Sequence, residues 1–227
     1  MMERTAVEGR SAEAPTRNRA LDPAIELSGL RRDFGDRTAL DGLDLRVEAG
    51  ASVAVLGPNG SGKSTLLRIL AGLLRPTAGE VSVLGLSLPK ENHRLRGKVG
   101  YLGHEPLLYR DLSPRENLQL AAALNGIDEE TAGPRIDRLI DAVGMSARAG
   151  DRVAELSAGM RQRIDICRAI LHEPPLLLFD EPDAHLDPEA RREIAPLIVA
   201  GDGRTRVVVS HDRGAATEDS DFVVELG

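Results

Sequence analysis

Short hydrophobic runs along the chain predict strands that alternate with amphipathic helices. Residues 25–27 and 43–47, on either side of a turn-rich segment at 33–37, predict a pair of short antiparallel strands. Residues 51–56 form an apolar run that ends at a glycine and predicts a strand. The segment after it carries leucine and isoleucine at helical spacing as far as residue 74. The beginning of the chain therefore predicts a small antiparallel sheet, followed by a strand, a loop and a helix.

The middle of the chain predicts two further strands and then a helical region. Residues 80–84 and 99–102 have the patterns of strands. Ser113 is followed at once by proline and, three residues on, by glutamate, which is a typical helix start. We therefore expect an inserted α-helical subdomain over about 111–155, with a second helix at 134–143.

The last third of the chain returns to alternating strands and helices. Ser157 can cap a helix, residues 176–179 form a wholly apolar strand, and Asp187 with the following proline opens another helix. Residues 206–209 predict one more strand, and 221–225 could add a last one. The whole pattern predicts an α/β fold with a mixed core sheet, an N-terminal antiparallel β-subdomain and the inserted helices.

Length and composition limit the classes of function. The 227 residues fit one domain, expected at 23–227, after a charged tail at 1–22 that we expect to be disordered. A net charge of −7 with scattered Lys and Arg argues against a nucleic-acid partner. The single cysteine, Cys167, excludes an internal disulfide and is expected to be buried. No apolar run approaches the ~18 residues that span a bilayer, so we expect no membrane-spanning helix.

The segment GPNGSGKS has the spacing of a phosphate-binding loop between a strand and a helix. Its glycines let backbone N–H groups surround phosphate oxygens, and the helix N-terminus adds a positive dipole end. The lysine would reach the β and γ phosphates, and the last serine would offer a hydroxyl to Mg²⁺. The expected nucleotide contacts are Gly57, Pro58, Asn59, Gly60, Ser61, Gly62, Lys63 and Ser64.

Two carboxylates follow the apolar strand at 176–179. We expect Asp180 to hold Mg²⁺ through its water shell and Glu181 to polarise an attacking water. Carboxylates at a buried strand end are costly without such a task, and the alternative of a helix-capping pair is weaker beside a phosphate loop. His211 ends the strand at 206–209, although a single histidine in such a turn is more often structural.

Five motifs in this order resemble those of the ATP-binding cassette (ABC) ATPases. They are GPNGSGKS, LSAGM at 156–160, FDEP at 179–182, AHLD at 184–187, and His211. The resemblance implies ATP as the nucleotide, ATP hydrolysis, and a homodimer in which each LSAGM closes over the ATP of the partner. Ser157 and the backbone of Ala158 and Gly159, at a helix N-terminus, would bind that γ phosphate.

The same resemblance assigns the other nucleotide contacts. Thr65 would contact the α phosphate, Asp187 belongs to the loop that touches the opposite phosphate loop, and His211 would sense the γ phosphate. Phe34 resembles the aromatic residue that stacks on adenine, although a phenylalanine near a strand is usually part of the core.

Two positions depart from the common ABC pattern. His104 stands where many members carry the glutamine that links Mg²⁺ to the membrane partner, and it could still bond to a metal-bound water. Met160 replaces the last glutamine of the signature. Together with the segments GHEPLLY, DLSPRENL and RQRIDICRAIL, they resemble the haem-exporter ATP-binding subunits (CcmA type) of cytochrome c maturation. This implies integral membrane partners of the CcmB and CcmC type and a peripheral position on the cytoplasmic face of the inner membrane.

Other ABC functions stay open at this point. One is the ATPase of another small exporter, such as an ABC-2 type drug or polysaccharide system. A second is a non-transport ATPase such as that of iron–sulphur assembly. DNA-repair ATPases need a coiled coil or long insertion, which is not present, and the single phosphate loop excludes two cassettes in this chain.

Overall fold

The computed structural model describes residues 23–198, 203–211, 213–218 and 220–227, so the tail expected at 1–22 lies outside the described residues. These residues divide into two compact units. The first unit contains residues up to 96, residues 178–180 and the described residues from 203 onward, and the second contains 97–177 and 181–198. Within these ranges, no helix combines the length and the hydropathy needed to cross a membrane.

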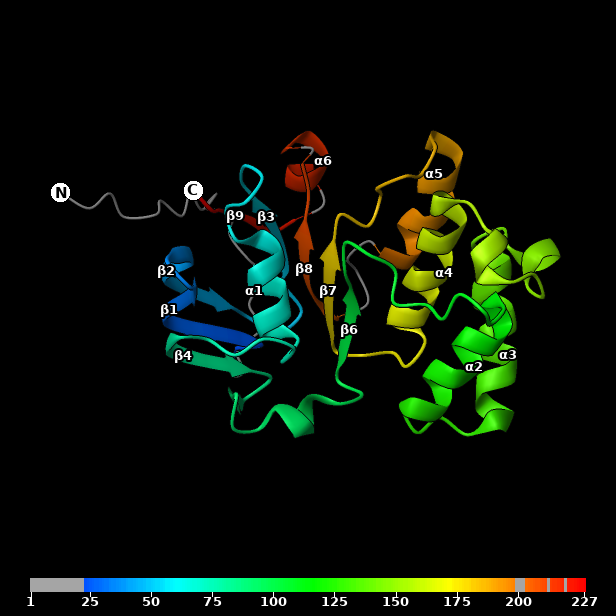
Figure 1. Cartoon of the computed structure of the whole chain (residues 1–227), viewed down its shortest axis with the longest axis horizontal. Helices are drawn as coiled ribbons and strands as arrows, with labels where there is room; N and C mark the ends of the chain where they lie inside the picture. Colours follow the sequence, from blue (N-terminus) through cyan, green and yellow to red (C-terminus); the bar gives the residue numbers. More distant parts are fainter. Residues whose placement is uncertain (1–22, 199–202, 212, 219) are drawn as a thin grey trace. The chain divides into compact units, whose positions relative to one another are not determined.

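An antiparallel sheet forms part of the first unit (Figure 1). Its strands, in the order β2-β1-β4-β5, are β1 (Ile25–Phe34), β2 (Arg37–Val47), β4 (Ala78–Val83) and β5 (Leu86–Leu88). The predicted antiparallel pair is confirmed, but its strands are longer than expected and continue through 33–37, with Phe34 opposite Arg37. Register shifts between Leu27 and Arg32 break the simple alternation on which the sequence prediction depended.

The second sheet has the order β6-β7-β8-β3-β9. Its strands are β3 (Ser52–Leu56), β6 (Val99–Leu102), β7 (Leu176–Asp180), β8 (Thr205–Val209) and β9 (Phe222–Glu225). β3 is parallel to both β8 and β9, and every residue of β3 and β7 is buried. The predictions of a strand at 51–56 and of a buried strand at 176–179 are therefore confirmed.

Two helices accompany the strands of the first unit. α1 (Lys63–Leu70) is shorter than expected, because the chain turns at Gly72 and leaves Leu73 exposed. α6 (Arg213–Glu218) was not predicted, since its six residues are too few to show a period. A short 3₁₀ turn, η1 (Asn92–Leu95), lies in the segment after β5.

Four helices belong to the second unit. They are α2 (Pro114–Leu124), α3 (Glu129–Ala142), α4 (Ala158–Ile170) and α5 (Pro188–Ile198), with 3₁₀ turns η2 (Ser146–Arg148) and η3 (Val153–Glu155). α3 begins before the expected residue 134, because the Asp128 carboxylate accepts a hydrogen bond from the amide of Thr131 and caps the helix. Pro134 therefore lies inside the helix and does not begin it.

The predicted start of α2 is confirmed as a complete capping box. The Ser113 hydroxyl accepts from the Glu116 amide at 3.2 Å, and the Glu116 carboxylate accepts from the Ser113 amide at 2.8 Å. These hydrogen bonds hold the pKa of Glu116 below its ordinary value.

Replacing Ser113 by alanine should destabilise the protein by about 1 kcal/mol, because the helix loses a side-chain cap. Urea unfolding followed by circular dichroism measures this change. Ser87→Ala, at an exposed position of β5, is the control and should change the unfolding midpoint little. Equal stability of the two variants would contradict the importance of the box.

Candidate functional site

The phosphate loop in the first unit joins the end of β3 to the start of α1. Lys63 is buried, and its ammonium donates to the carbonyl oxygens of Gly57 at 2.7 Å and of Pro58 at 2.9 Å. The Ser61 hydroxyl is also buried and has no hydrogen-bond partner among the described residues. The lysine therefore lies inside the loop, where an anion would meet its charge.

Gly62 shows why a glycine is needed where the loop meets the helix. Its φ of 97° lies in the left-handed region, and a Cβ atom would stand 2.3 Å from the carbonyl oxygen of Ala39. No side chain caps the N-terminus of α1. The first N–H groups of this helix are therefore left for another acceptor, as a phosphate site requires.

Polar residues follow β8, which neighbours β3, and β7, which is the next strand beyond β8. Figure 1 shows β7 and β8 running in the same direction, so their carboxyl ends meet at one edge of the sheet. Asp180 ends β7 and is buried, and His211 comes two residues after β8 and is exposed. The structure thus brings the loop, Asp180 and His211 to the same edge, as expected.

The residues at this edge fit a magnesium ion. The Asp180 Oδ2 atom is buried without a hydrogen-bond partner among the described residues, and Ser64 lies in the first turn of α1. In the described part of the chain, no three His, Cys, Asp or Glu residues form a metal cluster. Mg²⁺ suits such a site, because it binds through one or two protein oxygens together with waters and phosphates.

Phe34 is not a core residue, since 46% of it is exposed at the end of β1. The Arg32 guanidinium carbon lies 4.4 Å from the centre of its ring. Near it, hydrogen bonds from Arg31 and Thr38 hold the pKa of Asp33 below its ordinary value. Because the ring is exposed, it is accessible for the expected stacking on adenine, which stays a prediction.

Arg37 also belongs to this group, although the sequence did not suggest it. From β2, its guanidinium donates to the carbonyl oxygen of Gly60 at 3.0 Å. Nothing in its local pattern distinguishes it from other exposed arginines, because the contact joins residues 23 positions apart.

The signature segment (residues 156–160) lies in the second unit. Ser157 caps α4, as predicted, by accepting from the Met160 amide at 3.2 Å, and Ser157 and Ala158 are exposed. A Cβ atom on Gly159 would stand 2.7 Å from the carbonyl oxygen of His185. The segment therefore presents an accessible helix N-terminus, and Gly159 permits close approach of the 184–187 loop.

The other candidates of the second unit lie in turns. Glu181 has a φ of 54°, and Gln162 of α4 donates to the carbonyl oxygen of the next residue, Pro182, at 3.2 Å. Asp187 caps α5 by accepting from the Ala190 amide at 2.8 Å, and His104 is exposed in the loop after β6. Gln162 was not predicted, although a glutamine on the buried face of a helix is itself a signal.

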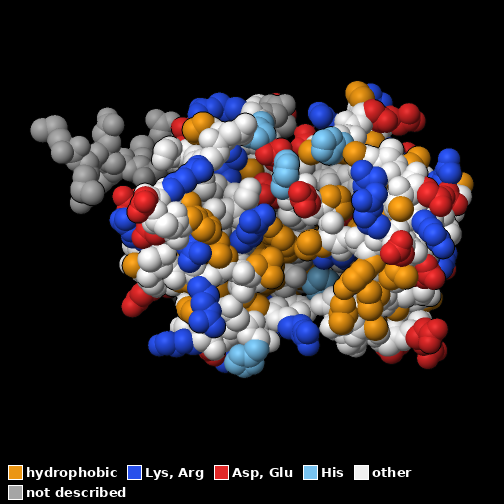
Figure 2. All heavy atoms as spheres, viewed as in Figure 1, with side chains coloured by type: hydrophobic (Ala, Val, Ile, Leu, Met, Phe, Trp, Pro, Cys, Tyr) orange, Lys and Arg blue, Asp and Glu red, His pale blue; other side chains and the backbone are white. Residues whose placement is uncertain are grey.

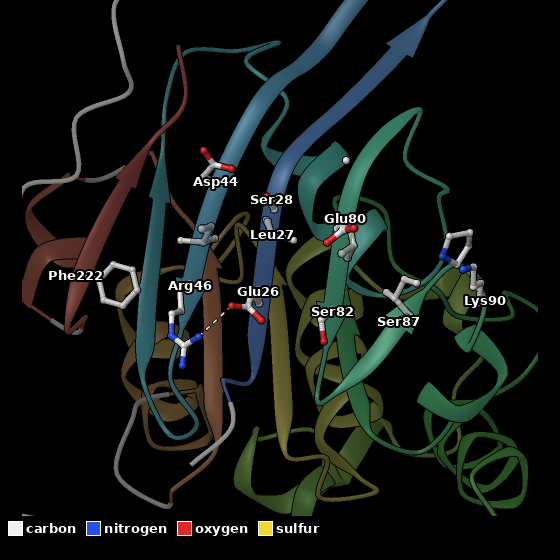
Figure 3. A pocket seen from close by; sticks show the side chains of 15 residues that line it. Glu26, Leu27, Ser28, Asp44, Arg46, Glu80, Ser82, Ser87, Lys90 and Phe222 are labelled. Carbon is white, nitrogen blue, oxygen red and sulfur yellow. Dashed lines mark hydrogen bonds and ion pairs between the residues drawn. The ribbon is translucent and has the colours of Figure 1, made fainter. Parts of the chain in front are cut away.

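A separate concavity lies on the antiparallel sheet of the first unit (Figure 3). It measures about 1040 Å³, and Figure 3 shows Arg46 of β2 paired with Glu26 of β1 beside it. None of the site residues expected from the sequence lines this concavity. It is therefore distinct from the nucleotide site.

The glycine loop at a strand–helix junction and the buried carboxylate of a nearby strand define a P-loop nucleotide-binding protein. The family model "ABC transporter" matches residues 40–184, which is more than half of the chain. The chain therefore belongs to the ABC transporter family and has an ABC-type ATPase domain.

Curated relatives and solved structures agree with this family. The chain is 40% identical over 173 residues to the daunorubicin resistance ATP-binding protein DrrA3 of Streptomyces coeruleorubidus, covering 76% of this chain and 55% of that protein. It is 35% identical over 191 residues to the Nod factor export ATP-binding protein I of Ralstonia nicotianae, covering 83% and 60%. The chain thus spans little more than half the length of these relatives.

A solved structure also matches this chain. It is a dimeric ATP-binding cassette in a post-hydrolysis state, bound to ADP and Pi, and it matches with a TM-score of 0.81 at 28% identity, covering 89% of this chain and 94% of that one. The expected α/β fold of ABC type is confirmed.

Arg37→Ala should weaken ATP binding by about 3- to 10-fold, the usual effect of losing one hydrogen bond to a binding loop. Titration with a fluorescent ATP analogue measures the Kd. Arg46→Ala is the matched control, because Arg46 lies on the same strand but pairs with Glu26 and Glu48. An equal Kd for both variants would show that the bond to Gly60 does not shape the loop.

Proposed function

We propose that this chain is the ATP-binding and ATP-hydrolysing subunit of an ABC exporter, in which two copies enclose two MgATP. The observation that carries the proposal is the phosphate loop with Lys63 inside it, at the same sheet edge as a buried Asp180 whose Oδ2 has no partner among the described residues. A buried cation and a buried carboxylate both cost free energy unless they are paired or hydrogen-bonded, and a bound phosphate and Mg²⁺ would supply such partners.

The first unit supplies the nucleotide-binding half of this function. Lys63 and the amides of residues 57–65 hold the phosphates, with Thr65 at the α phosphate, while Phe34 stacks on adenine. Ser64 and Asp180 hold Mg²⁺, which neutralises phosphate charge when it is bound. His211 donates to the γ phosphate and responds to its loss.

The second unit supplies the groups for hydrolysis and for the partner copy. Glu181 would accept a proton from the attacking water, and His104 would hydrogen-bond to a water held by Mg²⁺. Ser157 with the amides of Ala158 and Gly159 binds the γ phosphate held by the other copy, and Asp187 lies at that contact. The dimeric state of the matched cassette supports this pairing.

Glu181→Gln should lower ATP hydrolysis by about 100-fold or more, because the general base is lost while ATP binding is kept. Phosphate release measures the rate, and gel filtration with MgATP should show a trapped dimer. Glu130→Gln, an exposed change on α3, is the control. Persistent hydrolysis without a trapped dimer would remove Glu181 from this role.

The exported molecule is best proposed from the relatives. Their names concern daunorubicin resistance and Nod factor export, so they support a small exporter of the drug or polysaccharide type, which was the alternative in the sequence analysis. Haem export remains the second candidate, because His104 and Met160 favour it, but these names do not support haem, cytochrome c maturation or CcmB and CcmC as partners.

The membrane partner is expected to dock on the second unit. The loop after β6 exposes Leu107 and Tyr109, and Figure 2 shows hydrophobic side chains gathered over α2, the helix that follows this loop. Apolar side chains exposed together mark an interaction surface. This surface would hold the chain on the cytoplasmic face of the membrane as a peripheral subunit.

Purification of the tagged chain in mild detergent should recover an integral membrane protein, which mass spectrometry identifies. Tyr109→Ser should reduce its recovery, because Tyr109 is 63% exposed beside the proposed surface. Leu73→Ser is a matched control, equally exposed at 63% but in the first unit. Purification without any membrane protein would contradict the transport function, and a cytochrome c maturation subunit would favour haem export.

A further inference from the structure

The loop that carries His104 is held at both ends by buried or half-buried polar side chains. We call residues 103–109 the His104 loop. Before it, Arg168 of α4 donates to the carbonyl oxygen of Tyr101 at 2.6 Å. After it, the buried Asn117 accepts from the Tyr109 amide at 2.7 Å and donates to the Tyr109 carbonyl at 3.0 Å. The loop is therefore fixed to two helices of its own unit.

Asp165 lies one helical turn before Arg168 and is fully buried. Its Oδ1 accepts from the Arg168 Nε at 2.5 Å, and its Oδ2 has no partner within hydrogen-bond geometry among the described residues. Burial raises the pKa of Asp165, while the Arg168 charge and the amide of Leu107 act in the opposite direction. A fully buried carboxylate is costly, so this pair points to a task other than stability.

Gln162 stands three residues before Asp165 on the same helix. It is buried, and it donates to the Pro182 carbonyl in the turn that carries Glu181. Polar side chains thus occur at every third position of this part of α4, at Gln162, Asp165 and Arg168. Residues at this spacing lie near one another on a helix surface. One row of polar side chains on α4 contacts both the Glu181 turn and the base of the His104 loop.

The strand before the loop also packs closely against α4. A Cβ atom on Gly100 of β6 would stand 2.3 Å from the carbonyl oxygen of Ala169. His172, just beyond α4, hydrogen-bonds to the Val99 carbonyl at 3.2 Å. A displacement of α4 therefore cannot leave β6 in place, because tightly packed elements move together.

We propose that Gln162, Asp165 and Arg168 are positioning residues that join the His104 loop and the Glu181 turn to the helix beginning at the signature segment. Through these contacts, the helix whose N-terminus would receive a γ phosphate holds the catalytic turn and the partner-facing loop in position. The expected effect of these residues on ATP hydrolysis rests on the proposed function. Their attachment of the loop and the turn to α4 rests on the contacts alone.

The test replaces the buried pair by apolar side chains, as Asp165→Leu with Arg168→Met. Exchange of both partners of a buried ion pair for apolar residues commonly preserves folding, whereas removal of one partner leaves a buried charge. The matched control is Asp151→Leu with Arg148→Met, because this pair has the same spacing and a 2.8 Å contact but is largely exposed in the same unit. Gln162→Leu tests the Glu181 turn separately.

We expect both test variants to lower kcat for ATP hydrolysis about tenfold with KM for ATP changed less than about twofold, since small misplacements of reacting groups reduce the rate. The hydrogen bonds described for these side chains go to residues of the strand before the His104 loop, of the Glu181 turn and of α4 itself. Arg168→Lys, which keeps the charge but not the fork of donors, should recover only part of the rate. An unchanged kcat in both folded test variants would overturn the proposal.

Hydrogen exchange gives a second result that does not depend on hydrolysis. The pair variant should exchange faster at the amides of residues 103–109, and Gln162→Leu should exchange faster at residues 182–186, with no such change in the control. Unchanged exchange at these segments in folded variants would overturn the joining of loop and turn to α4. If the unaltered protein and all variants fail to hydrolyse ATP, the proposed function fails, and the exchange pattern still decides the structural role.

Discussion

The nucleotide site depends on the parallel arrangement of buried strands. β3 and β8 run parallel with Val55 opposite Val209, and all residues of β3 and β7 are buried. Parallel strands end at one edge, so the polar residues that follow them must collect there. The apolar strands stabilise the unit. The charged groups, whose burial costs free energy, lie at or just beyond the ends of these strands. The Lys63 ammonium offsets part of its cost through two loop carbonyls, whereas the buried Asp180 Oδ2 has no such partner among the described residues.

Helix α4 connects three segments of the second unit: the signature segment, the Glu181 turn and the strand before the His104 loop. Its N-terminus is exposed and capped by Ser157, which leaves its first amides available to an anion. Its buried face carries Gln162, which donates to the Pro182 carbonyl in a turn. It also carries Asp165, which accepts from Arg168, and Arg168 donates to the Tyr101 carbonyl of β6. Hydrophobic residues would pack this face with less cost. The polar side chains fix the positions of irregular backbone that strands and helices cannot hold by themselves.

Local patterns predicted the parts of the fold that local chemistry determines. The capping serines 113 and 157 were found because their partners lie three residues away, and the buried strands were found because their residues are uniformly apolar. The bulged ends of β1 and β2 were not found, because register shifts interrupt the alternation. Arg37 and Gln162 contact residues 23 and 20 positions away, and no local pattern reports such a pairing. The site was therefore predictable where its residues form a motif, and not where they support one.

The motifs identify the family of this chain, but they do not identify the exported molecule. Residues around ATP meet the same nucleotide in every ABC ATPase, so residues that contact ATP carry little information about the exported molecule. In the proposed function, membrane subunits would contact that molecule, and this chain would meet them through its surface. The 40% identity to DrrA3 extends over 173 residues, so the compared residues include surface positions as well as the motifs. Two substitutions near the nucleotide give no information about that surface. The wider similarity to drug-resistance and Nod factor export proteins therefore outweighs the two positions that suggested haem. The surface around Leu107 and Tyr109, and not the phosphate loop, is where the choice of membrane partner should be encoded.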